Sequence, residues 1–407
     1  PEDPADELFD TIMAETDGTA RDAIARALTD NAQATIDWMR DEGCEFMQHP
    51  RRSWGMPMMM PGRKMRAGLD WENSGPNLFL KSLTQKLEKR GGNLRRGIRV
   101  RGLITDDGRV AGVEIEGGET IEASAVIIAD GGFQADRELI GQYITGSPES
   151  LCQRNTETGR GDGIRMAIAV GAETVGLDKF YGHVLSRDAL TNEHLWPYPQ
   201  LDVICAKGIV VTTDGRRFAD EGQGGIYVTN AIAALDDPLS ATVVFDRTVW
   251  EDAREADIVP PNPSLVDNGG TVLDADNLDE LASAAGIDAG GLKRTVNEYN
   301  KLIQAGSAPA LSPPRTTQTC PAHTIDKSPF YAIPLCAGIT VTSGGIAVDG
   351  QARVLAENGN VIEGLYAAGS TVGGLEGGPR GGYVGGLIKA FGIGRLAGRS
   401  VAGKLSG

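Results

Sequence analysis

With 407 residues, of which 41% are hydrophobic and 23% charged, the chain can bury a large core and form about two domains. Its formal net charge of −16 argues against a nucleic-acid partner, because no basic stripe offsets the acidic background. The five cysteines are scattered without C-x-x-C spacing, which disfavours a zinc site or a disulfide framework and favours reduced thiols in the cytoplasm. No apolar run approaches the ~20 residues of a membrane span, and the acidic start PEDPADELFD is unlike a signal peptide.

The N-terminal part is predicted to be helical. Residues 4–47 carry Leu, Ile, Ala and Trp at helical spacing, which indicates two helices. The stretch HPRRSWGMPMMMPGRK at 49–64 has no periodicity and predicts a loop over an apolar surface. Met58, Met59 and Met60 either line a ligand pocket or fill an irregular gap, as methionine readily does. A further helix is predicted at 77–90.

Three consecutive strand patterns follow, at 97–106, 108–117 and 119–130, separated by Asp-Gly and Gly-Gly turns. They predict a β-meander that leads into a buried strand. The last strand, AVIIA, is apolar throughout and runs into Asp130-Gly131-Gly132, after which DRELIGQYI is predicted to be helical. An apolar strand that ends in glycines at the carboxyl edge of a sheet is where α/β proteins place ligands.

The middle of the chain differs in character, with more prolines and short mixed elements. We expect a helix at 161–170, strands at 208–213 and 242–246, and a helix at 292–303. From residue 330 strands return, and a final helix extends to Lys404. These changes predict a first domain part at 1–145, an inserted domain at 146–328 and a second domain part at 329–407.

A run dense in glycine, from Gly369 to Arg395, follows the strand VIEGLYAAGS and leads into a helix of small residues. Glycine allows backbone N–H groups to approach a ligand closely, and a helix N-terminus attracts negative charge. The run therefore predicts a site for a phosphate-bearing cofactor or a reduced flavin ring. Tight loop packing alone is the alternative.

An ordered set of motifs makes this prediction specific: AVIIADGGF (125–133), GRGDGIRMAIAVGAE (159–173), GRRFADE (215–221), GITVTSGGIAVD (338–349) and GLYAAGS with its glycine run (364–398). Nearly the whole chain thereby resembles the FAD-binding family of fumarate reductases, ketosteroid dehydrogenases and tricarballylate dehydrogenases, and most of all the tricarballylate-dehydrogenase-like branch. The resemblance implies an α/β fold in which a Rossmann-like, two-part FAD-binding domain carries an inserted α+β capping domain. It also implies FAD as cofactor.

The resemblance assigns cofactor contacts residue by residue. Towards the adenosine and the phosphates it places Val100, Ala129, Gly131 and Gly132; by the isoalloxazine ring Gly344 and Gly345; by the ribitol Gly369 and Ser370; and at the flavin pyrimidine edge Gly385, Gly386 and Leu387. Relatives have an acid where this chain has Ser370, and a hydroxyl is a weaker partner for the ribitol than a carboxylate.

The family begins with a strand, a G-x-G-x-x-G turn and a helix, followed by an acid for the ribose. This unit does not occur after Pro1. Losing the central strand of a parallel sheet would leave its neighbours with unpaired backbone groups. We therefore expect that further residues precede Pro1, and a fragment is the alternative.

The resemblance implies hydride transfer between flavin N5 and a C–C bond next to a carbonyl or carboxylate, with a side chain handling the proton. The substrate would be a small organic acid or an enone-like or ketosteroid-like molecule, and the electron acceptor is not identified. The candidate catalytic residues are Arg380 as a carboxylate ligand, Tyr383 as a proton donor and His183 as a substrate contact, each with a purely structural alternative.

Two departures argue against fumarate reduction itself. Gly225 stands where fumarate reductases have an arginine, and Val341 where they have a histidine. Arg216 and Arg217 are expected to anchor the inserted domain rather than to contact substrate. The rival function is a flavoprotein-fold subunit or scaffold that has lost FAD.

Overall fold

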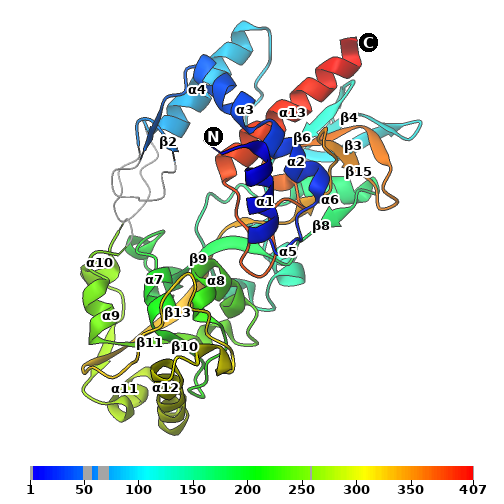
Figure 1. The fold of residues 1–407 in the computed structure, drawn as a ribbon. Coiled ribbons are helices and arrows are strands. Elements are labelled where there is room, and N and C mark those ends of the chain that lie inside the picture. Colours follow the sequence, from blue (N-terminus) through cyan, green and yellow to red (C-terminus); the bar gives the residue numbers. More distant parts are fainter. Residues whose placement is uncertain (1–2, 49–56, 63–72, 257–258, 407) are drawn as a thin grey trace.

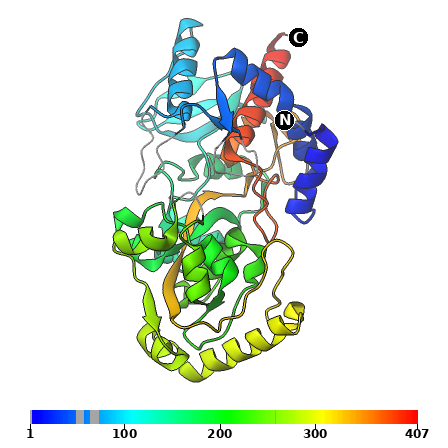
Figure 2. The ribbon, with the colours of Figure 1, turned by 60° about the vertical axis from the view of Figure 1, so that its left-hand side comes forward.

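The computed structural model describes residues 3–48, 57–62, 73–256 and 259–406. The ribbon forms two lobes, with both ends of the chain in the upper lobe of Figure 1 and the middle of the chain in the lower one. Figure 2 shows β13 (Phe330–Thr342) extending from the junction of the lobes down into the lower lobe. This strand is the main continuous element at the junction.

The upper lobe contains helices on several sides of small sheets. Its helices are α1 (Ala5–Glu15), α2 (Asp22–Asp30), α3 (Ala32–Asp41), α4 (Gly75–Lys89), α5 (Arg137–Tyr143), α6 (Asp162–Ala169) and α13 (Gly386–Ser406), with the 3-10 turn η7 (Gly369–Thr371). Its strands are β1 (Phe46–Gln48), β2 (Pro57–Met59), β3 (Val100–Asp106), β4 (Arg109–Ile115), β5 (Thr120–Glu122), β6 (Val126–Ile128), β8 (Thr174–Val175), β14 (Gly345–Ile346), β15 (Arg353–Leu355) and β16 (Val361–Ala367).

The lower lobe is built on the sheet β10-β11-β13-β12. β7 and β9 pair with the C-terminal half of β13. The strands are β7 (Leu151–Gln153), β9 (Phe180–Ser186), β10 (Ile209–Val211), β11 (Thr242–Asp246) and β12 (Leu273–Ala275). The helices are α7 (Asp202–Lys207), α8 (Gly225–Ala233), α9 (Arg247–Asp252), α10 (Pro261–Asp267), α11 (Leu278–Ala285) and α12 (Ala289–Gln304). Short 3-10 turns connect them: η1 (Pro148–Ser150), η2 (Arg187–Leu190), η3 (Glu193–Leu195), η4 (Glu221–Gln223), η5 (Pro238–Ser240) and η6 (Ala308–Ala310).

The predicted meander is confirmed. β3, β4 and β5 form an antiparallel sheet, and the two-residue turn at Asp107 and Gly108 has the positive φ angles (49° and 75°) that tight hairpins require. The apolar strand that follows, β6, leaves this sheet and pairs in parallel with β16. The prediction that this strand is buried was wrong, because β6 lies at the edge of its sheet and Ile127 is 40% exposed. The predicted helices and strands at 161–170, 208–213, 242–246 and 292–303 are also present, as α6, β10, β11 and α12.

The N-terminal prediction was wrong in two respects. Three helices occupy the region instead of two, because left-handed residues Asp17 and Gly18 end the first and Asn31, outside helical geometry, separates the next two. The helical pattern also stops before residue 46, where β1 pairs with β2. Most of the predicted loop at 49–64 lies outside the described residues, but 57–59 form β2 instead of a loop, because they pair with β1. Met59 is buried in a small core beside Met39 and Phe79, which supports gap filling.

The division of the chain at 145/146 and 328/329 stays a prediction. β13 follows the second proposed boundary and pairs with β11 and β12 of the lower lobe. The same strand pairs with β7 and β9 closer to the junction. The largest hydrophobic cluster accordingly includes residues of both lobes, among them Ile24 of α2 and Phe245 of β11. Separate clusters pack α11 against α12 in the lower lobe and α3 against α4 in the upper lobe.

Candidate functional site

The carboxyl ends of β6 and β16 meet at one edge of their sheet, as parallel pairing requires. Asp130 and Gly131 follow β6 at this edge, and Gly369 follows β16. Asp130 accepts a hydrogen bond from the Gly163 N–H at 2.7 Å, and the surrounding atoms raise the pKa of its carboxyl by desolvation. Ala129 is exposed beside it. The edge therefore collects polar groups on open backbone, the arrangement that α/β proteins use for ligands.

The predicted glycines at this edge divide into two kinds. Gly131 has a φ of 92° and open space where a side chain would project, so its backbone can approach a ligand. Gly132, Gly344 and Gly345 are enclosed instead: an added Cβ would lie 2.1 Å from the Thr342 hydroxyl, 2.2 Å from Gly176 and 2.0 Å from the Thr371 carbonyl, respectively. These three glycines permit close packing of chain segments, and their cofactor contacts stay predictions.

The turn after β16 brings further polar groups to the same edge. Gly369 has a φ of 73°, and Ser370 beside it is partly exposed. The buried Thr371 hydroxyl interacts with the Asp130 carboxyl and lowers its pKa, so the polar groups that follow β16 and β6 lie close together. This pair, next to the open backbone of Gly131, fits a polar ligand bound at the sheet edge, such as part of a dinucleotide.

The N-terminus of α13 is the second open group of donors. Within the described chain, the backbone N–H groups of Leu387 and Ile388 have no hydrogen-bond acceptor, while the Gly386 N–H donates to the Tyr383 hydroxyl at 2.7 Å. Leu387 is 46% exposed, so these groups can be reached from outside. A helix N-terminus with free N–H groups favours an electron-rich ligand edge. The residues present thus fit the predicted flavin, and its pyrimidine edge is what they would hold.

Val100 lies at the start of β3. It lines a cleft of about 420 Å³ with Asp162 and Arg165 of α6. Its assignment to the adenine stays a prediction.

His183 and Tyr383 are brought together through a residue that the sequence did not single out. His183 lies on β9 and shares a hydrogen bond with the Asp202 carboxylate at 2.5 Å through Nδ1, and one with the Tyr181 hydroxyl at 3.1 Å through Nε2. The Tyr181 ring stacks on the Tyr383 ring, with centroids 3.8 Å apart and an interplanar angle of 16°. Burial raises the pKa of the Tyr181 hydroxyl, which keeps it protonated. A polar row therefore connects the N-terminus of α13 to β9.

Arg380 is not part of this row. Its guanidinium donates to the Ala14 carbonyl at 2.9 Å and lies 3.8 Å from Glu15 and 3.7 Å from Asp17, at the C-terminal end of α1. The cation that does lie beside the row is Arg154. Buried, it donates to the Thr340 hydroxyl at 2.8 Å and the Pro197 carbonyl at 3.1 Å.

The sequence contained one usable signal for Tyr181. Tyr181 and His183 are two residues apart on a strand, so their side chains face the same side. Asp202 has no such signal, because it lies at the first residue of α7 and reaches His183 only through the fold.

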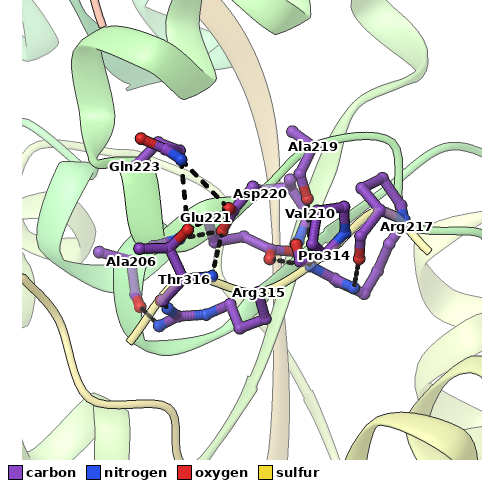
Figure 3. Close-up of polar contacts among 12 residues, drawn as sticks. Ala206, Val210, Arg217, Ala219, Asp220, Glu221, Gln223, Pro314, Arg315 and Thr316 are labelled. Atoms are coloured by element: carbon purple, nitrogen blue, oxygen red, sulfur yellow. Dashed lines mark hydrogen bonds and ion pairs between the residues drawn. The ribbon is translucent and has the colours of Figure 1, made fainter. Parts of the chain in front are cut away.

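Arg217 serves the scaffold, as predicted. Figure 3 shows it beside Glu221, to which it donates two hydrogen bonds, at 2.9 and 2.5 Å. Both side chains are buried, and Arg217 also donates to the Pro313 carbonyl at 2.7 Å. Asp220 binds the backbone N–H of Thr316 at 2.8 Å. The network holds the turn η4, which leads directly into α8, against the segment around Thr316.

Two further features concern the described residues as a whole. No helix among them is long and apolar enough to cross a membrane. They also contain no group of three or more His, Cys, Asp or Glu side chains that could hold a metal ion.

Comparison with known proteins gives a consistent result. Residues 1–385 match the model of the family described as FAD binding domain. The chain is 29% identical over 392 residues to an NADH:acrylate oxidoreductase of Vibrio harveyi, which covers 93% of this chain and 37% of that protein. It is 31% identical over 328 residues to a 4-oxocyclohexanecarboxylate 2-dehydrogenase of Sinomonas cyclohexanicum, which covers 74% of this chain and 55% of that protein. The chain therefore spans between about a third and just over half of these relatives.

Solved structures show the same fold. The open conformation of a flavocytochrome c3 fumarate reductase matches with a TM-score of 0.66 at 24% identity, covering 99% of this chain and 68% of the other. A 3-ketosteroid delta1-dehydrogenase from Sterolibacterium denitrificans matches with a TM-score of 0.68 at 20% identity, covering 100% and 89%. The predicted fold class and the predicted cofactor, FAD, are confirmed by these matches together with the family model.

Proposed function

We propose, because the chain belongs to the FAD binding domain family, that it is a flavin-dependent oxidoreductase acting on a C–C bond next to a carbonyl or carboxylate. The substrate would be a small organic acid or an enone-like or ketosteroid-like molecule. Bound FAD supplies the two-electron chemistry, and the chain supplies binding, orientation and proton handling. The observation that carries the proposal is the polar row of Tyr383, Tyr181 and His183 that begins at the open N-terminus of α13.

The names of the relatives support this reaction class. One acts on acrylate and the other on 4-oxocyclohexanecarboxylate, both of which carry a carboxylate. For a carboxylate substrate, Arg380 is the proposed ligand, and it would have to exchange its contact with Ala14 for the substrate. For a ketone, the hydroxyl of Tyr383 is the proposed donor, next to the Gly386 N–H.

A spectroscopic experiment tests the function. We expect the purified protein to show flavin absorbance, with or without added FAD, and to bleach on anaerobic reduction with dithionite. Acrylate, fumarate and 2-cyclohexenone are then added separately, and at least one activated alkene should restore the absorbance. A colourless protein that binds no added FAD would favour the non-catalytic scaffold instead, and a flavin that none of these acceptors reoxidises would contradict the reaction class.

We further propose a cytoplasmic location. All five cysteines are free thiols, which a reducing compartment preserves. Cell fractionation with a tagged protein tests this, and recovery outside the cytoplasm would contradict it.

A further inference from the structure

A chain of hydrogen bonds links the Tyr181 hydroxyl through His183 to the Asp202 carboxylate. The Asp202 carboxylate engages His183 Nδ1 with one oxygen, and its other oxygen accepts the Val184 N–H at 2.8 Å. This fixes the His183 ring, because a carboxylate on Nδ1 sets which nitrogen carries a proton. Nε2 is then directed at the Tyr181 hydroxyl. The side chains of His183 and Asp202 are 14% and 21% exposed, so solvent screens this row only weakly.

Gly225 makes the position of Asp202 possible. A Cβ added at Gly225 would lie 2.0 Å from Asp202 Cγ and 2.3 Å from its Oδ1, closer than atoms can approach. Gly225 opens α8 without a left-handed φ, so backbone geometry does not demand glycine there. Any side chain at this position would move the Asp202 carboxylate away from His183.

The start of α8 is itself held rigidly. Just before α8, Arg217 binds Glu221 of the turn η4, and the Thr316 N–H donates to Asp220, the residue before this turn, as Figure 3 shows. Glu221 also accepts the Val210 N–H at 2.9 Å, which ties the turn to β10. The place of Gly225 against Asp202 is therefore set by the core of the lower lobe.

We propose that Tyr181 is the catalytic residue that exchanges a proton with the substrate, and that Asp202, positioned by Gly225, acts on it through His183. The inference rests on the proposed function. In the reducing direction, the Tyr181 O–H bond breaks and its proton forms a C–H bond on the substrate carbon next to the one that would receive the hydride. A proton from solvent then adds to His183 Nε2, which gives a transient imidazolium, and Nε2 passes the proton to the phenolate. In the oxidising direction each proton transfer reverses. Bound FAD would supply the hydride in the first case and accept it in the second.

The neighbouring groups are consistent with this assignment. The charge of Arg154 lowers the pKa of the Tyr181 hydroxyl and so stabilises a transient phenolate, whereas Tyr383, Asp202 and Tyr198 act in the opposite direction. His183 faces Asp202 and Tyr181, and the carboxylate stabilises a transient imidazolium.

Three variants test the proposal by activity. Tyr181→Phe keeps the ring stack but removes the hydroxyl, and we expect turnover to fall by about 100-fold or more with flavin binding retained. Asp202→Asn and Gly225→Ala should each lower kcat by about 10-fold or more and change its pH profile in the same way. Alanine at a helical glycine otherwise tends to stabilise. The matched control is Gly403→Ala, a helical glycine with open space around it, which should leave kcat unchanged.

A second readout does not depend on turnover. The chain has only four histidines, so ring nitrogens can be assigned by NMR with His183→Gln as reference. We expect a strongly downfield Nδ1–H signal that disappears in Asp202→Asn and Gly225→Ala and persists in Gly403→Ala.

The outcomes separate the two proposals. Full turnover in Tyr181→Phe, or a His183 signal unchanged in Gly225→Ala, would overturn the inference while leaving the oxidoreductase assignment in place. A wild-type protein that binds FAD but transfers no hydride to or from any acceptor would instead refute the proposed function, and the inference with it.

Discussion

At the scale of single residues, the ion pair of Arg217 and Glu221 is buried, so replacing one oxygen of Glu221 by nitrogen would leave the Arg217 charge without its partner. A buried charge that loses its partner is destabilising by about 3–5 kcal/mol, whereas an exposed pair contributes about 1 kcal/mol or less. Glu221→Gln should therefore lower the free energy of unfolding by about 3 kcal/mol in urea titration.

The control is Glu116→Gln, whose partner Arg101 is exposed along with it. We expect a change within about 0.5 kcal/mol there, as for most surface substitutions. Equal losses in the two variants would show that Glu221 does not stabilise the lower lobe through its charge.

At the scale of elements, the glycine run is tied to the helix that follows it. Lys389 of α13 donates to Glu376 at 2.8 Å, and both side chains are almost fully buried. Glu376 also accepts the Val384 N–H at 3.3 Å, so one carboxylate closes the loop that carries Tyr383.

We expect Lys389→Met to destabilise the protein by about 3–5 kcal/mol, because it leaves the Glu376 charge buried and unpaired. Adding Glu376→Gln should recover part of this loss, since the unpaired charge is then gone. A double-mutant cycle in urea unfolding measures the coupling, and strictly additive effects would contradict the pairing.

At the scale of the whole molecule, the largest hydrophobic cluster includes residues of both lobes. A ligand that binds only the folded state, present at 100 times its Kd, stabilises by about 2.7 kcal/mol. FAD should therefore raise the Tm in calorimetry in a concentration-dependent way, and ATP at equal concentration should not. Because this cluster includes residues of both lobes, we expect a single main transition. Two well-separated transitions would show that the lobes unfold independently.

Much of the architecture could be predicted from the sequence, because local physics determines it. Alternation and two-residue turns define β3 and β4, a uniformly apolar run defines β6, and helical spacing defines α12. The same reasoning indicated the sheet edge at Gly131 and the open N-terminus of α13. It failed at the N-terminal helices, where the left-handed Asp17 and Gly18 and the non-helical Asn31 interrupt a pattern that hydrophobic spacing alone continues.

Only the tertiary structure decided which residues meet. Tyr181 stacks on Tyr383, and Asp202 reaches His183, across segments whose spacing carries no mutual signal. The same holds for glycines: Gly131 is open, whereas Gly225 and Gly345 face atoms from distant segments. The sequence by itself determined the elements and the flavin family, since these depend on neighbouring residues and motifs. The proposed proton path depends on contacts made by folding, so no local pattern could reveal it.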